Sequence, residues 1–146
     1  SFVQLQLRCP MKRKITLSIR NEQDFGQDNT DLLEYKTVAF LYKKNEQYYI
    51  LYPDENYNGT RTYIKIQPEE ESIIIYRDEP ELQQSFRSGR TTTGRLETPY
   101  GIFNLEIDTR SLEIDLDKGE LVLRYRLYLE GKYICLNYLK ISWDIL

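Results

Sequence analysis

Three polar residues interrupt the apolar faces of predicted strands, and together they could hold an anionic group. Arg77 shares its alternating face with two isoleucines, Tyr125 with four leucines, and Asn137 with large apolar residues further along its strand. A guanidinium, a phenol and an amide at the end of an apolar pocket can clamp a carboxylate or a phosphate. The alternative is that Arg77 ends its strand facing solvent, while Tyr125 and Asn137 are hydrogen-bonded structural groups.

Tyrosines are concentrated in one stretch of predicted hairpins, with lysines and arginines between them. Aromatic rings and cations on one sheet face can stack on single-stranded nucleic acid. Tyrosine is also an ordinary strand residue whose ring packs while its hydroxyl reaches water, and the net charge of −3 favours this second interpretation. The interaction surface predicted from this stretch consists of Tyr48, Tyr49, Tyr52, Tyr57, Arg61, Tyr63 and Lys65.

The residue inventory removes several kinds of chemistry. Histidine is absent, so there is neither an imidazole base nor a His metal ligand. Cys135 lies in an alternating apolar strand and is expected to be a buried, inert thiol. The acidic run that begins at Asp115 is similar to the start of a calcium loop, but Gly119 and Arg126 stand where an EF-hand needs ligands. We therefore expect no catalytic residues, no metal site and no cofactor.

The overall composition favours strands over helices. The chain has 146 residues, the size of one domain, with fourteen Ile, ten Thr and thirteen Tyr but a single Ala. The acidic balance argues against binding to double-stranded nucleic acid, and no apolar run is long enough for a membrane-spanning helix. The two cysteines, Cys9 and Cys135, are expected to be reduced thiols in a cytoplasmic protein.

Alternating hydrophobicity predicts roughly ten short strands joined by mostly short turns. Their hairpin-like succession favours a closed barrel over a sandwich, because closure removes exposed sheet edges. Residues 80–86 are the one place where a turn or two of helix competes with a strand. The expected strands span residues 15–19, 33–42, 48–52, 60–67, 72–77, 82–88, 91–98, 101–108, 112–116, 120–129 and 133–143.

The beginning of the chain differs from the rest. Met11 is followed directly by a strand pattern, whereas residues 1–10 carry none. We therefore expect residues 11–146 to form a single β-barrel domain. Residues 1–10 are expected to be an added segment or a loosely ordered arm.

The second half of the chain carries a distinctive pattern of strands and turns. It comprises Ser85-Phe86-Arg87-Ser88-Gly89, then Thr98-Pro99-Tyr100-Gly101 at the start of a strand, then residues 109–117 and a long hairpin ending at Trp143. Together with the strand after Met11, this pattern resembles the YwiB-like family of small uncharacterised bacterial proteins. The resemblance implies a lipocalin-like (calycin) β-barrel, mainly from Gram-positive bacteria, and it assigns no functional residues.

These observations predict an all-β fold, a single antiparallel lipocalin-like up-and-down β-barrel of about 8–10 strands. The predicted function is to bind a small apolar or amphipathic ligand in the lumen, at Arg77, Tyr125 and Asn137, without catalysis. The alternative is a protein- or RNA-interaction module that uses the tyrosine-rich hairpins. A homodimer formed through the barrel rim or a poorly paired edge is compatible with either.

Overall fold

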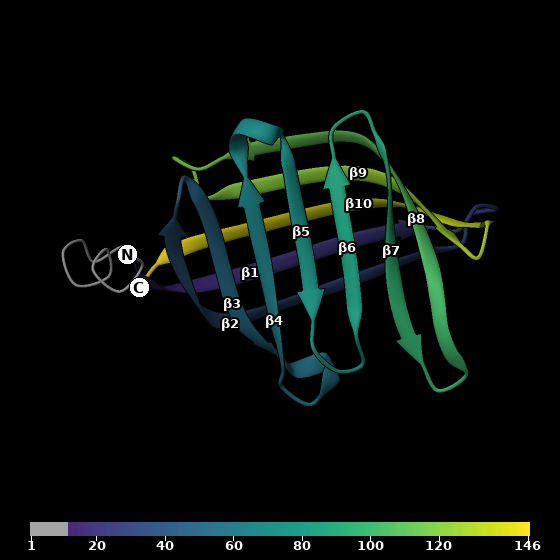
Figure 1. The fold of residues 1–146 in the computed structure, drawn as a ribbon, viewed down its shortest axis with the longest axis horizontal. Helices are drawn as coiled ribbons and strands as arrows, with labels where there is room; N and C mark the ends of the chain where they lie inside the picture. The colour runs from purple at the N-terminus through teal and green to yellow at the C-terminus, as the bar shows by residue number, and fades with distance from the viewer. Residues whose placement is uncertain (1–11) are drawn as a thin grey trace.

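Ten antiparallel strands form a closed barrel (Figure 1) in the computed structural model, which describes residues 12–146. Each strand pairs with its neighbours in sequence, and β1 pairs with β10 to close the sheet, so the predicted up-and-down barrel is confirmed. The strands are β1 (Arg13–Asp24), β2 (Thr30–Lys44), β3 (Gln47–Asp54), β4 (Thr60–Gln67), β5 (Ser72–Arg77), β6 (Leu82–Arg87), β7 (Thr91–Thr98), β8 (Gly101–Asp115), β9 (Glu120–Leu129) and β10 (Lys132–Ile145). The predicted arm at residues 1–10, with Met11 and Cys9, lies outside the described residues.

The helical content of the described residues is confined to two short 3₁₀ segments, η1 (Glu55–Tyr57) and η2 (Pro68–Glu70). Residues 82–87 form strand β6, so the helix considered for this region is absent. In the part of the chain that the structure describes, no helix is long and apolar enough to cross a membrane.

Two predicted interruptions between strands were wrong. The sequence suggested a loop from residue 21, but β1 continues to Asp24 because Asn21 and Gln23 keep the inward alternation and hydrogen bond to a neighbouring strand. The sequence also suggested a break between residues 108 and 112. Instead, β8 runs through this region with a bulge, where the pairing register with β9 shifts between Thr109 and Ser111. An extra residue at a bulge shifts the alternation, which is why the pattern looked like two strands.

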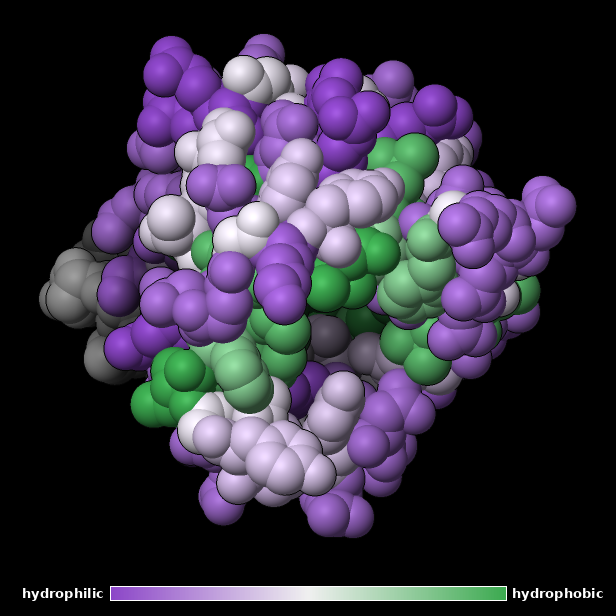
Figure 2. All heavy atoms as spheres, turned by 90° about the vertical axis from the view of Figure 1, so that its right-hand side faces the viewer, coloured by the Kyte–Doolittle hydropathy of each residue, from purple (hydrophilic) through white to green (hydrophobic). Residues whose placement is uncertain are grey.

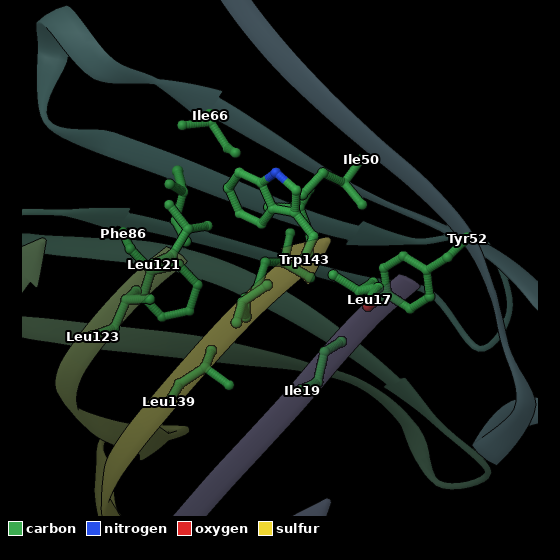
Figure 3. Packing of buried hydrophobic residues seen from close by; sticks show 14 of the residues in the cluster. Leu17, Ile19, Ile50, Tyr52, Ile66, Phe86, Leu121, Leu123, Leu139 and Trp143 are labelled. Atoms are coloured by element: carbon green, nitrogen blue, oxygen red, sulfur yellow. The ribbon is translucent and has the colours of Figure 1, made fainter. Parts of the chain in front are cut away.

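One end of the barrel is filled by a dense apolar core. Figure 3 shows Trp143, Leu17, Ile50, Ile66 and Leu121 pointing toward one another from five different strands. Each of these side chains is at most 7% exposed. Alternation places every second residue of these strands inside, where the Ile and Leu side chains pack in one buried cluster with Trp143.

The inward faces change from apolar to polar toward the other end of the barrel. On β10 they run from Trp143 through Ile141 and Leu139 to Asn137, and on β5 two isoleucines are followed by Arg77. The same change occurs on β1, β3 and β4, and the polar residues lie toward the same end. Figure 2 looks onto the end where β1 ends and β10 begins, and it shows a hollow with apolar side chains on its rim.

The pairing between β6 and β7 is the weakest join in the barrel. Only Leu82 with Leu96 and Gln83 with Arg95 are paired in register. Beyond them the two strands are joined by the Thr92 hydroxyl, which donates to the carbonyl of Ser85. The backbones approach so closely here that a Cβ on Gly94 would lie 2.1 Å from the carbonyl oxygen of Gln83.

Candidate functional site: a polar cavity in the barrel lumen

The polar end of the lumen contains a cavity of about 310 Å³. Its walls come from every strand except β7 and β8, together with the 3₁₀ turn η1. Apolar side chains such as Ile64, Ile75 and Leu139 line its inner part. The structure brings the three predicted lumen residues, Arg77, Tyr125 and Asn137, to this one cavity; their role in binding a ligand stays a prediction.

Arg77 is the positive charge of the cavity, and only 4% of the residue is exposed. Its Nε donates a hydrogen bond to the carbonyl oxygen of Pro80 at 2.8 Å. Its guanidinium carbon lies 3.6 Å from the centroid of the Tyr57 ring. Among the described residues no carboxylate comes within 4.0 Å of it, so Arg77 is not ion-paired. The alternative prediction, that Arg77 faces solvent, was wrong.

Asp54 is a negative charge in the same cavity, 7% exposed. Its Oδ1 accepts a hydrogen bond from the backbone nitrogen of Asn56 at 3.0 Å, which caps the start of η1. No lysine or arginine nitrogen of the described chain lies within 4.0 Å of its carboxylate. The sequence placed Asp54 in a hairpin loop and gave no reason to select it.

Two tyrosines form a hydrogen-bonded pair beside these charges. Burial raises the pKa of Tyr35 to about 12, and burial likewise raises the pKa of Tyr52 well above its usual value. A side-chain hydrogen bond joins the two hydroxyl groups. Because both pKa values are raised, both phenols are neutral at physiological pH.

Tyr125 lies between the cavity and the apolar core. It is 4% exposed, and its ring meets the Phe86 ring edge to face, with 4.7 Å between the centroids. Burial raises the pKa of the Tyr125 hydroxyl, so it stays protonated. It can therefore donate a hydrogen bond but carries no charge.

Asn137 organises an amide cluster on the wall formed by β1 and β10. Its Oδ1 accepts from Asn21 Nδ2 at 3.2 Å and from Gln23 Nε2 at 3.1 Å, and its Nδ2 lies 3.3 Å from Cys135 Sγ. Burial raises the pKa of the Cys135 thiol. The Asn21 Oδ1 is buried without a hydrogen-bond partner. Asn21 and Gln23 were missed because residues 21–30 were interpreted as a loop.

The predicted tyrosine-rich surface does not exist as one surface, and this is a correction. Tyr52 is buried in the lumen, Tyr48 packs on the core from inside, and Tyr57 covers Arg77 at the cavity. Alternation sends residues 48, 50 and 52 inward, whereas Tyr49 faces outward, as do Tyr63 and Lys65 of β4. The seven residues are thus divided between two sides of the sheet, with Arg61 exposed and ion-paired to Asp78 at 3.1 Å.

The outward tyrosines do belong to an aromatic strip across β2–β5, which we define as Tyr42, Tyr49, Tyr63 and Tyr76. Tyr42 stacks on Tyr49 with 5.6 Å between ring centroids, and Tyr63 stacks on Tyr76 at 5.3 Å. Lys65 Nζ lies 5.9 Å from the Tyr49 ring centroid. Neighbouring rings in each pair pack on each other and are half-buried. Tyr42 and Tyr76 were not among the predicted surface residues.

The comparisons with known proteins agree with this architecture. Residues 17–141 match the model of a family described as a domain of unknown function (DUF1934). The chain belongs to this family. A curated relative, the uncharacterised β-barrel protein YwiB of Bacillus subtilis (strain 168), is 26% identical over 134 residues, covering 89% of this chain and 92% of the relative.

A solved structure shows the same fold. The crystal structure of the YwiB protein from Bacillus subtilis superposes with a TM-score of 0.76 at 20% sequence identity, covering 93% of this chain and 94% of that one. The resemblance to the YwiB-like family is therefore confirmed, and the DUF1934 family is one of uncharacterised β-barrels.

Proposed function

We propose that this protein is a lipocalin-like binding protein that takes one small amphipathic molecule into its lumen. An acidic group of the ligand, a carboxylate or a phosphate, binds Arg77, and its apolar part packs on the inner wall formed by Ile64, Ile75 and Leu139. A closed up-and-down barrel with room for one small ligand inside is the arrangement that lipocalins use. The cavity of about 310 Å³ lies at the lower end of the range for ligand pockets.

The observation that carries the proposal is the state of Arg77. Arg77 is only 4% exposed as a residue, and a nearby carboxylate would normally compensate for the hydration that such burial removes. Only one of its five N–H donors has a protein acceptor, the carbonyl of Pro80. A ligand carboxylate can accept two parallel hydrogen bonds from such a group and neutralise its charge.

Tyr125 and Asn137 have different parts in this proposal. Tyr125 forms the floor between cavity and core, where a neutral phenol can donate to a polar atom of the ligand. Asn137 is saturated by protein partners on its oxygen. We therefore assign it to positioning Asn21 and Gln23, whose side chains line the same cavity.

Native mass spectrometry of freshly purified protein tests the proposal directly. We expect a small molecule that leaves on denaturation, and the same spectrum gives the subunit count and so tests the homodimer. The Arg77→Met variant should lose the molecule, while Arg61→Met, an exposed arginine on the adjacent strand, should keep it. Circular dichroism would verify that both variants fold.

Titration with octanoate supplies a second measurement that does not depend on a copurified ligand. We expect octanoate to raise the melting temperature of the wild type and of Arg61→Met, but not of Arg77→Met. A wild type that carries no adduct and does not respond to octanoate would contradict the proposal.

The aromatic strip supports a second candidate, an interaction surface for RNA or protein. Two stacked tyrosine pairs beside Lys65 offer a platform on which unpaired bases can stack. A gel shift with single-stranded RNA at moderate salt, comparing the wild type with Tyr49→Ala, tests it. The lumen is better supported, because the rings of the strip are already half-buried by packing on each other.

A further inference from the structure

Arg77 is accompanied by an opposite charge that it does not neutralise. Both Arg77 and Asp54 line the lumen cavity, at 4% and 7% exposure. In residues 12–146 neither makes an ion pair within 4.0 Å, either with the other or with a third residue. A barrel that buried these groups only for stability would bring them together, since an unpaired buried charge is costly.

Both charges are neighbours of Tyr52, Asp54 along β3 and Arg77 across the sheet. Asp54 follows Tyr52 on the same face of β3, and Tyr52 pairs with Thr62, which in turn pairs with Arg77. The strands of Asp54 and Arg77 are thus two apart, roughly 10 Å at the usual strand spacing. Both charges act on Tyr35 and Tyr52, with opposite effects on the pKa of each phenol. Both charges line one cavity, so they face the same part of the lumen, and the gap between their charged atoms is more than 4.0 Å.

Each charge retains hydrogen-bonding capacity toward that gap. The cap to Asn56 uses Oδ1 of Asp54, so Oδ2 is available as an acceptor. The bond to Pro80 uses Nε of Arg77, so its terminal amino groups are available as donors. The Tyr57 ring over the guanidinium holds it in place without neutralising it.

We infer that the ligand carries both an acidic and an ammonium group, as an amino acid does, with the acid on Arg77 and the ammonium on Asp54. This inference rests on the proposed function and names its ligand class. A purely anionic ligand would satisfy Arg77 but add a second negative charge near Asp54, and a purely cationic ligand would do the reverse. A zwitterion with an apolar side chain satisfies both charges and fills the apolar inner wall.

Three probes that share one apolar body separate these cases: L-phenylalanine, 3-phenylpropionate and 2-phenylethylamine. The full chain would be freed of any copurified molecule by unfolding and refolding, and each probe titrated calorimetrically. We expect phenylalanine to bind at least tenfold more tightly than either of the others. Arg77→Met should abolish binding of the two probes that carry a carboxylate, L-phenylalanine and 3-phenylpropionate.

Asp54→Asn is the decisive variant, because asparagine has the same shape and also caps a helical turn well. We expect it to lower the affinity for phenylalanine to that of 3-phenylpropionate, while leaving 3-phenylpropionate binding unchanged or tighter. Asp78→Asn, an exposed carboxylate on the β5–β6 turn, is the matched control and should change neither affinity. Thermal unfolding would show whether each variant retains its fold.

The inference is overturned if 3-phenylpropionate binds as tightly as phenylalanine, or if Asp54→Asn leaves the phenylalanine affinity unchanged. The proposed function survives both of these results, since an acid would still bind at Arg77. Failure of all three probes to bind also overturns the inference. The proposed function fails separately, if Arg77→Met binds the acids as well as the wild type does.

Discussion

The ring of Tyr57 lies over the guanidinium group of Arg77, with 3.6 Å between the ring centroid and the guanidinium carbon. The two residues come from different elements, since Tyr57 ends the 3₁₀ turn η1 and Arg77 ends β5. Asp54 caps the same turn through its side chain. One short segment thus supplies the negative charge of the cavity and also holds the positive one.

Replacing Tyr57 should therefore lower the stability of the protein only if the aromatic ring is removed, and loss of the hydroxyl alone should have little effect. We expect Tyr57→Leu to lower the free energy of unfolding by about 1–2 kcal/mol, because Arg77 is buried and a cation–π contact is stronger when its cation is desolvated. Tyr57→Phe retains the ring and should be close to wild type. Urea unfolding measures both, and an equal loss in the two variants would contradict the role given to the ring.

The amide cluster predicts a larger cost at Asn137. Asn137→Leu removes the acceptor for the side chains of Asn21 and Gln23, and we expect the free energy of unfolding to fall by about 1–3 kcal/mol. Asn104→Leu is the control, because Asn104 is exposed on β8 and its change should stay within about 0.5 kcal/mol. Similar losses at the two positions would show that the cluster contributes nothing specific.

The buried tyrosines predict a loss of stability at alkaline pH. Burial raises the pKa of Tyr35 to about 12 and also raises the pKa values of Tyr52 and Tyr125. Above pH 10 the unfolded chain ionises these phenols while the folded chain keeps them protonated, so the unfolded state is favoured increasingly. We expect the free energy of unfolding to be unaffected by these groups below pH 10. Between pH 10 and 12 the free energy of unfolding should fall by up to about 1.4 kcal/mol per pH unit for each buried tyrosine.

Urea unfolding followed by the fluorescence of Trp143, from pH 8 to 11.5, measures this slope. Tyr125→Phe should reduce it, whereas Tyr100→Phe should not, because Tyr100 is 91% exposed. If every tyrosine of the folded protein titrated near pH 10 by its absorbance, burial would not have the effect described.

The close approach of β6 and β7 makes Gly94 intolerant of a side chain. A Cβ there would lie 2.1 Å from the carbonyl oxygen of Gln83, which is backbone and cannot swing away. We expect Gly94→Ala to destabilise the protein by at least about 1–3 kcal/mol. Thr93→Ala, at the adjacent exposed position, should have little effect. An unchanged melting temperature for Gly94→Ala would contradict this prediction, because it would show that β6 and β7 can separate without loss of stability.

The barrel could be predicted from the sequence because alternation in each strand is a local property. The same property identified Arg77, Tyr125 and Asn137 as polar residues on inward faces, and all three do line one cavity. Which inward residues meet, however, depends on the register between strands. Gln23 contacts Asn137, although the two residues are 114 positions apart in the sequence, and no local pattern predicts such a pair.

Other parts of the site were missed for different physical reasons. Asp54 occupies the last position of β3, where turn residues and strand residues look alike. The tyrosine-rich stretch was treated as one surface although its own alternation divides it, with Tyr48 and Tyr52 on the face of Ile50 and Tyr49 on the other. Counting the period there would have separated the lumen residues from the outer ones.

The apolar packing around Trp143 has a consequence for the guests that this barrel can accept. This packing closes one end of the lumen, so a ligand whose apolar chain enters first can advance only until that chain reaches the cluster around Trp143. Ligands are then sorted by length as well as by charge. In a series of straight-chain acids, we expect each added methylene to strengthen the binding free energy by about 0.8 kcal/mol until the cavity is filled. The next methylene should weaken binding. The length of the acid at which the affinity stops rising and begins to fall measures the depth of the cavity.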